Sequence, residues 1–262
     1  MMNLILLLIA ALVNGSTATV SSLKSAPANG WVAYRAEARE PVTITCCGDW
    51  DGGWSRCTGC RLEKEGSLNI NRHEKDDIGP VGESQFLIFT KFHDGIPERV
   101  RIFSTTCDLD AGGNIVNLVD KVTPAESVAF LRDVAERGEK KARNGAMLAL
   151  SLHNNATDAL IDLARRNSSK DVRGQALFWL SQQAGQRAAD ALKDAVDNDP
   201  EESVRAKAVF GISQLPNDES IPLLVDLMKH NKSREVRKKA AFWLGQKNDP
   251  RALAAIEDIL RN

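Results

Sequence analysis

The five cysteines are the residues whose type and spacing are best suited to chemistry. Cys46 and Cys47 are adjacent, Cys57 and Cys60 are separated by two residues, and Cys107 stands alone. Thiolates from two neighbouring pairs can bind a tetrahedral zinc ion, and a Cys-x-x-Cys pair can carry redox chemistry. In an exported chain the cysteines of a small domain usually form disulfides, so we favour disulfides, with the first pair linked to the second. Because five is an odd number, at least one thiol stays free or pairs between molecules.

Other side chains that could bind a metal lack the spacing of a complete site. Asp108, Asp110 and Asn114 alternate like the start of a calcium loop, but Val119 stands where an EF-hand has its final glutamate. None of the four histidines lies three or four residues from another. We therefore expect a plain turn after residue 108, and no catalytic residue, metal or cofactor.

The N-terminal segment predicts export. An apolar run from Leu4 to Val13 is too short to span a bilayer as a stable helix, and small residues follow at Ser16 and Ala18. This pattern is typical of a secretory signal, residues 1–18, cleaved after Ala18. An uncleaved anchor is the alternative, although no positive charge other than the free amine precedes the run. Either form places the protein in the periplasm, the cell envelope or outside the cell, and cleavage leaves no stable membrane span.

A linker at residues 19–30 and a small β-rich domain at residues 31–120 are expected next. Helical periodicity is absent there, and segments 32–38 and 41–45 alternate as strands do. Segments 86–92 and 99–103 are rich in β-branched and aromatic residues, and His93-Asp94-Gly95 between them indicates a hairpin turn.

From residue 121 onward the chain is organised by a repeated pattern. Copies of Val-Arg-x-x-Ala-x-Phe begin at Val172, Val204 and Val236, a spacing of 32 residues, and a weaker copy begins at Ala142. A fixed period of this length is typical of a stacked helical solenoid. A small residue recurs in each copy, and the three strong copies carry it at Ala176, Ala208 and Ala240.

Each repeat reads as two helices joined by a short turn. Asp249 and Pro250 are typical of an N-cap and a first helical residue, and Asp218 is expected to be the corresponding N-cap in the preceding repeat. Thr123-Pro-Ala-Glu126 has the form of a capping box, which predicts a capping helix at about residues 124–137.

Residues 139–262 resemble HEAT repeats of the short kind named after phycobilisome lyases. The resemblance is carried by the Val-Arg start, the small residue and the Asp-Pro start of the second helix. It implies an αα-solenoid. With the capping helix and the β-rich domain, the expected fold is mainly α: an αα-solenoid of about four repeats plus a capping helix, residues 121–262, preceded by the cysteine-containing β-rich domain. The resemblance further implies that first helices lie on the convex side and second helices on the concave side.

Two ladders of residues recur at the repeat period. The first is basic: Arg143, Arg173, Arg205 and Arg237. We expect these arginines to bond to carbonyls and acids of the neighbouring repeat, although they could also bind an acidic partner. The second is aromatic: Phe178, Phe210 and Phe242. Helical spacing points these rings away from the second helices, so they either pack between first helices or form an apolar stripe for a partner.

The combination of solenoid and export favours a non-enzymatic protein-binding or scaffold role with another protein as partner. The formal net charge of −1 gives no electrostatic footprint for nucleic acid. The alternative is an enzyme. The resemblance allows HEAT-repeat oxidoreductases or chromophore lyases, but the His-Glu pair that such oxidoreductases need for iron occurs here only at His73-Glu74, outside the repeats. A redox or zinc site at Cys46, Cys47, Cys57 and Cys60 is the other enzymatic possibility.

Overall fold

The computed structural model describes residues 13–44, 60–63, 70–72, 83–107, 109–119, 121–183 and 185–261. Two compact units meet between Ala156 and Thr157. The first unit therefore holds the sheet together with helices α2 (Pro124–Arg137) and α3 (Lys140–Leu152), whereas the sequence places a domain limit after residue 120. None of the described helices is long and apolar enough to cross a membrane.

The first unit is built on a mixed sheet with the order β2-β9-β3-β6-β7, and β5 pairs with β3. The strands are β2 (Thr17–Val20), β3 (Gly30–Ile44), β5 (Ile70–Arg72), β6 (Glu83–His93), β7 (Ile96–Ser104) and β9 (Val116–Val119). Strands β3, β6 and β7 run antiparallel, and β2 and β9 add parallel pairs at one edge. Asp94 and Gly95, which join β6 to β7, both have positive φ, so the predicted hairpin is present with its turn where the sequence places it.

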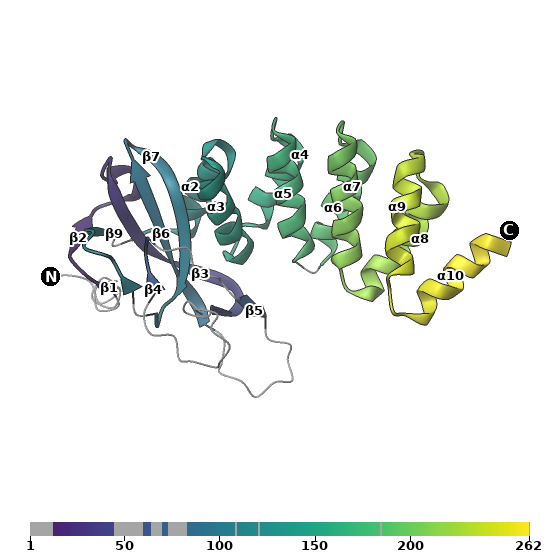
Figure 1. The fold of residues 1–262 in the computed structure, drawn as a ribbon, viewed down its shortest axis with the longest axis horizontal. Helices are drawn as coiled ribbons and strands as arrows, with labels where there is room; N and C mark the ends of the chain where they lie inside the picture. The colour runs from purple at the N-terminus through teal and green to yellow at the C-terminus, as the bar shows by residue number, and fades with distance from the viewer. Residues whose placement is uncertain are drawn as a thin grey trace. The chain divides into compact units, whose positions relative to one another are not determined.

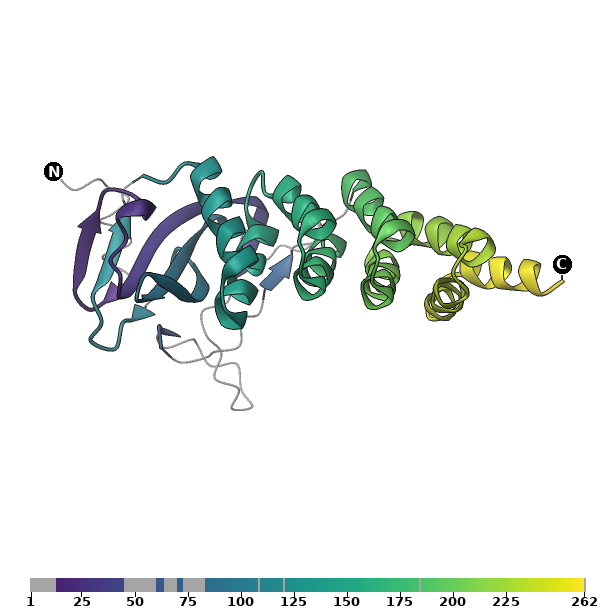
Figure 2. The same cartoon turned by 90° about the horizontal axis from the view of Figure 1, so that it is seen from above.

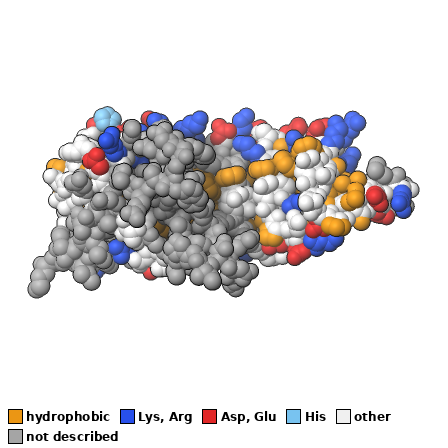
Figure 3. Space-filling view, turned by 60° about the horizontal axis from the view of Figure 1, so that its bottom comes forward, with side chains coloured by type: hydrophobic (Ala, Val, Ile, Leu, Met, Phe, Trp, Pro, Cys, Tyr) orange, Lys and Arg blue, Asp and Glu red, His pale blue; other side chains and the backbone are white. Residues whose placement is uncertain are grey.

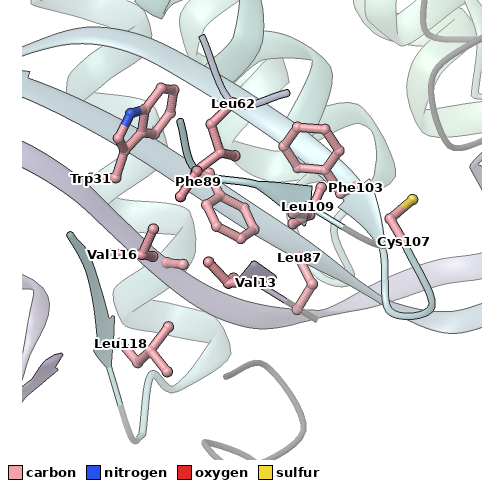
Figure 4. Close-up of a cluster of buried hydrophobic side chains, with 12 residues drawn as sticks. Val13, Trp31, Leu62, Leu87, Phe89, Phe103, Cys107, Leu109, Val116 and Leu118 are labelled. Atoms are coloured by element: carbon pink, nitrogen blue, oxygen red, sulfur yellow. The ribbon is translucent and has the colours of Figure 1, made fainter. Parts of the chain in front are cut away.

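A second, smaller sheet covers one face of this sheet. It consists of β1 (Val13–Asn14), β8 (Leu109–Asp110) and β4 (Cys60–Arg61), paired in parallel in the order β1-β8-β4. Between the two sheets lies a buried cluster, shown in Figure 4, that includes Trp31, Leu87, Phe89 and Phe103. The alternating residues of β3 and β6 supply it, so the predicted strand pattern marks a real core face.

Helices α2 and α3 cover the opposite face of the main sheet, as Figure 1 shows. The backbone of α3 approaches β7 so closely that a Cβ at Gly145 would lie 2.0 Å from the Val100 carbonyl oxygen. A residue larger than glycine cannot take this position without moving the helix. The weak repeat copy that begins at Ala142 therefore packs its first helix on the β-sheet.

The capping box predicted at Thr123 is present at the start of α2. The Thr123 side chain accepts a hydrogen bond from the Glu126 backbone N–H at 3.3 Å, and Glu126 Oε2 accepts one from the Thr123 backbone N–H at 2.9 Å. These bonds satisfy donors that the first turn of a helix leaves open.

The second unit is a succession of helices, drawn from green to yellow in Figures 1 and 2. They are α4 (Thr157–Arg166), α5 (Lys170–Ser181), α6 (Gln186–Asn198), α7 (Glu202–Gln214), α8 (Asn217–His230), α9 (Arg234–Gly245) and α10 (Pro250–Arg261). First helices α5, α7 and α9 pack on one another in turn, and second helices contact second helices, α4 against α6 and α8 against α10. The small-residue positions Ala176, Ala208 and Ala240 are fully buried, which allows these helices to approach closely.

The two predicted N-caps differ in outcome. Asp249 caps α10, because its Oδ1 accepts a hydrogen bond from the Arg251 backbone N–H at 2.9 Å. The expectation for Asp218 is wrong, because α8 begins at Asn217 after Pro216. Asp218 instead lies in the first turn of α8 and binds Arg251 Nη1 at 2.7 Å. This ion pair therefore links α8 to α10.

Candidate functional site

Each arginine of the basic ladder bonds to the turn that precedes its own helix. Arg205 Nη1 donates to the carbonyl oxygens of Asp199 and Pro200 at 2.7 and 3.1 Å. Arg237 Nη1 donates to Asn231 and Lys232 in the same way at 2.7 and 3.1 Å. Arg143 Nη2 reaches the Gly138 carbonyl oxygen at 3.2 Å. Each guanidinium thus lies against carbonyl oxygens that follow the C-terminal end of the preceding helix. A positive charge is favourable there because the C-terminal end of a helix dipole is negative.

Arg173 carries an additional and buried ion pair. Its Nη1 donates to the carbonyl oxygens of Asn167 and Ser168, and its Nε and Nη2 bind the two carboxylate oxygens of Asp199 at 2.7 and 3.0 Å. The side chains of Arg173 and Asp199 are only 8% and 4% exposed. This two-bond contact joins α5 to the turn after α6 and so fixes one repeat against the next.

Asp199 belongs to a third ladder that the sequence interpretation missed. Asn167, Asp199 and Asn231 stand 32 residues apart, and each accepts a hydrogen bond on its side-chain oxygen from the backbone N–H two residues later, at 2.9, 2.9 and 3.0 Å. Such turns let the chain leave one helix and enter the next. The signal was available in the sequence as an Asn or Asp at the repeat period.

The aromatic surface is the second feature of the first helices. We use this name for Phe178, Trp179, Phe210, Phe242 and Trp243. Phe178 and Phe242 are 42% and 58% exposed, whereas Phe210 is half-buried with its ring 5.0 Å from that of Trp243 on the next first helix. Phe178 and Phe242 each contact the tryptophan that follows them, at 5.0 Å. The phenylalanine ladder is thus mixed, with two rings open to solvent and the middle one packed between repeats.

Lysine side chains accompany these rings. Lys207 and Lys239 each lie three residues before a phenylalanine, on the same helical face, and both are exposed. Neither has an ion pair within the portion of the chain that the structure describes. Figure 3 shows one side of the molecule, where hydrophobic side chains of the helical half form separate patches among charged ones.

The cysteine predictions fall mostly outside the described residues. Cys46, Cys47 and Cys57 are not described, and only the backbone of Cys60 is, in β4. Cys107 is fully buried in the cluster between the two sheets and is disulfide-bonded.

Of the residues that alternate like a calcium loop, Asp108 is outside the described residues. Asp110 Oδ1 accepts a hydrogen bond from the Gly112 backbone N–H at 2.8 Å, and Gly112 and Gly113 both have positive φ, which is the geometry of a turn.

A buried chain of polar side chains in the first unit had no counterpart in the sequence analysis. His153 Nε2 lies 2.9 Å from Ser127 Oγ, which lies 3.0 Å from Tyr34 Oη. His153 Nδ1 lies 2.5 Å from the carbonyl oxygen of Asn154. Because a carbonyl can only accept, Nδ1 carries the proton, Nε2 accepts from the Ser127 hydroxyl, and Ser127 accepts from Tyr34.

Burial fixes the protonation of this polar chain. Removal from solvent lowers the pKa of His153, because a charged imidazolium is disfavoured there, and the hydrogen bond to Asn154 only partly opposes that effect. Removal from solvent likewise raises the pKa of Tyr34 well above its usual value. His153 is therefore neutral near pH 7, and the three side chains hold β3, α2 and the end of α3 together through neutral hydrogen bonds.

No cluster of three or more His, Cys, Asp or Glu side chains placed to hold a metal occurs among the residues that the structure describes. The zinc prediction concerns residues 46–60, of which the structure describes only residue 60.

Tandem helical hairpins whose first and second helices form separate layers define the second unit as an αα-solenoid. Its repeats are HEAT repeats: the family model for HEAT repeats matches residues 157–234 and 189–262. No curated protein matches the chain.

The solved structures that are similar to the chain include the following two. One is the complex of CpcE and CpcF of phycocyanin lyase from Nostoc sp. PCC7120, with 20% identity, a TM-score of 0.40, and coverage of 53% of this chain and 91% of that one. The other is human deoxyhypusine hydroxylase in complex with glycerol, with 18% identity, a TM-score of 0.33, and coverage of 52% of this chain and 57% of that one.

Proposed function

We propose that this protein is an exported, non-enzymatic protein-binding module whose aromatic surface holds a partner protein. The observation that carries the proposal is the exposure of Phe178 and Phe242 on the first helices, at 42% and 58%. Aromatic rings are enriched at the centres of protein interfaces because they bury a large apolar area with few rotatable bonds. HEAT solenoids present extended surfaces, which suits such a role.

The charges near the rings indicate the chemistry of the partner. Lys207 and Lys239 stand one turn before Phe210 and Phe242 and have no ion pair among the described residues. An apolar segment flanked by carboxylates would bury the rings and pair with both lysines. Opposite charges at an interface rim raise the association rate and select among partners.

Replacing the two exposed rings tests this function without unfolding the protein. We expect the double variant F178S/F242S to keep its helical circular dichroism and to lose a partner that the parent retains in a quantitative cross-linking experiment on intact cell envelopes. Each ring is open to solvent in the unbound protein, so its loss should change the free energy of unfolding little. The same loss should weaken the binding of the partner strongly.

Leu253→Ser is the matched control, because Leu253 is 61% exposed but lies on the second helix α10. The proposal requires that this variant retain the partner. If the double variant retains every cross-link of the parent, the aromatic surface is not the binding site.

Export makes a separate prediction about the N-terminus and the cysteines. Cleavage after Ala18 removes β1 and the first half of β2, and leaves Thr19 and Val20 opposite Leu118 and Val119 of β9. We expect the protein recovered from the periplasm to begin at Thr19 and, under non-reducing conditions, to show the mass deficit of two disulfides. Recovery in the cytoplasm with an intact N-terminus would contradict export, and four or five free thiols would contradict the disulfides.

A further inference from the structure

A ladder of glutamines accompanies the aromatic surface of the second unit. In each strong repeat copy the phenylalanine is followed four residues later by a glutamine, and residues four apart share one face of a helix. Gln182 is half-buried, and Gln214 and Gln246 are exposed, at the C-terminal ends of α5, α7 and α9. Each of these first helices therefore carries one aromatic ring and one amide on the same face, and the pair recurs every 32 residues.

Serine hydroxyls position two of these amides. Ser181 Oγ donates to the Phe178 carbonyl oxygen at 2.6 Å and accepts a hydrogen bond from Gln182 Nε2 at 3.3 Å. The next repeat has the same arrangement, because Ser213 Oγ bonds to its own phenylalanine carbonyl at 2.6 Å and to Gln214 Nε2 at 3.1 Å. An amide has two N–H donors and an acceptor oxygen, so each of these glutamines keeps one N–H and its oxygen for a ligand.

The spacing of the first helices selects the backbone form of that ligand. Helices α5, α7 and α9 pack on one another in turn, and packed helices lie about 8–10 Å apart. A polyproline II segment returns to the same side every three residues, which is about 9 Å. A β-strand returns to the same side every two residues, about 6.6 Å, and so falls out of step with the helices.

The amides exclude a helical ligand that has the same spacing. Seven residues of an α-helix span about 10.5 Å, which also fits the interval between first helices. However, the backbone N–H and carbonyl groups of an α-helix bond to one another, so the glutamine ladder would find no backbone partner on it. A polyproline II backbone has no internal hydrogen bonds, and its carbonyl oxygens can accept from the amides.

The rings suit the same kind of segment. Phe178 and Phe242 are exposed and two repeats apart, a distance that about six residues of polyproline II would span. Between them Phe210 packs against Trp243 at 5.0 Å and continues the aromatic surface. Proline-rich segments bind to surfaces lined by aromatic rings, and the fixed φ of proline lowers the conformational entropy that is lost on binding.

Lysines determine the charge of the segment. Lys207 and Lys239 are exposed on α7 and α9, three residues before a phenylalanine, and neither has an ion pair among the described residues. Lys238 is neutralised by Glu235 at 3.1 Å. On α5 a glutamine takes the place of the lysine, and Asp171 lies one turn farther from the ring. The charge complement of this surface is therefore an acidic segment that places its carboxylates over α7 and α9.

We propose that the aromatic surface and the glutamine ladder bind an acidic, proline-rich segment of the partner in the polyproline II conformation. This inference rests on the proposed function, because it names the chemistry of the partner at the same surface. Prolines of the segment pack on Phe178 and Phe242, its carbonyl oxygens accept from the glutamine amides, and its carboxylates pair with Lys207 and Lys239.

Fluorescence anisotropy of the full chain with labelled synthetic peptides tests this inference. The first peptide consists of four Glu-Pro-Pro triplets. The second consists of four Glu-Ala-Ala triplets, which keep the charge but favour a helix, and the third of four Lys-Pro-Pro triplets, which keep the backbone form but reverse the charge. We expect the first to bind with a dissociation constant on the order of 100 μM, and the other two at least about tenfold more weakly.

The double variant Q214L/Q246L tests the glutamine ladder. Both side chains are exposed, so helical circular dichroism should be kept, while binding of the Glu-Pro-Pro peptide should weaken by about tenfold because the amide donors are lost. Gln186→Leu is the matched control, because Gln186 is an exposed glutamine on the second helix α6. This variant should bind the peptide as the parent does.

Each contrary result has a defined meaning. Equal binding of the Glu-Pro-Pro and Glu-Ala-Ala peptides would overturn the polyproline II assignment, and unchanged binding by Q214L/Q246L would remove the ladder from the site. Binding of the Lys-Pro-Pro peptide as tight as that of the Glu-Pro-Pro peptide would contradict the acidic partner. If no peptide binds, this inference fails, whereas the proposed function is decided separately by the cross-linking of F178S/F242S.

Discussion

Asp199→Ala is expected to lower the free energy of unfolding of the helical unit by about 3–5 kcal/mol, because it leaves the buried guanidinium of Arg173 without its counter-ion. Arg173 would keep its bonds to the Asn167 and Ser168 carbonyls, but the two bonds at 2.7 and 3.0 Å to the carboxylate would be lost. Urea denaturation of the full chain, followed by circular dichroism at a helical wavelength, measures the change.

Asn231→Ala is the matched control, because Asn231 occupies the same turn position one repeat later. It accepts the Ser233 backbone N–H and donates to the exposed carboxylate of Asp197, so its loss removes two hydrogen bonds but strands no buried charge, at a cost of about 1 kcal/mol. The double variant R173M/D199A adds a second check, since removal of both charges should recover some of the stability lost in Asp199→Ala. Equal costs for Asp199→Ala and Asn231→Ala would show that the ion pair does not fix one repeat against the next.

The repeat unit could be predicted from the sequence because its determinants are local. Val172, Ala176 and Leu180 share a helical face by spacing alone, and all three are buried in the structure. The hairpin at Asp94-Gly95 and the capping box at Thr123 are local in the same sense. Each depends on backbone preferences within a few residues, which tertiary packing did not override.

The sequence pattern does not show which element packs against the apolar face of a helix. The pattern that begins at Ala142 marks an apolar face, and Ala142 and Ala146 are indeed buried. The pattern does not say that a sheet covers that face, and the close approach of Gly145 to Val100 is visible only in three dimensions. Periodicity therefore predicts the helix but not the compact unit to which the helix belongs.

The buried polar chain could not be predicted for a related reason. Tyr34, Ser127 and His153 come from a strand, the first turn of a helix and a helix end, separated by 93 and 26 positions. No spacing rule connects such residues, because the sheet topology alone brings them together.

Ala208→Asp is expected to lower the melting temperature by about 10 °C or more, because an unpaired carboxylate would replace a fully buried methyl group. Ala208 lies on α7 between the buried residues Val204 and Ile212, at the small-residue position of a central repeat. Burial of a charge without a partner belongs to the rare substitutions that cost more than about 4 kcal/mol. Thermal unfolding followed by circular dichroism measures the effect.

The cost should depend on pH in a defined direction. Burial raises the pKa of the introduced carboxyl group above its unfolded value, so lowering the pH favours the neutral form in the folded state, and some of the lost stability returns on moving from pH 7 to about pH 5. Ala254→Asp, on the exposed face of α10, is the control and should cost only the helix propensity of aspartate, about 0.7 kcal/mol. If Ala208→Asp melts within a degree or two of the parent, the first-helix register is wrong, and the placement of the aromatic surface on that register fails with it.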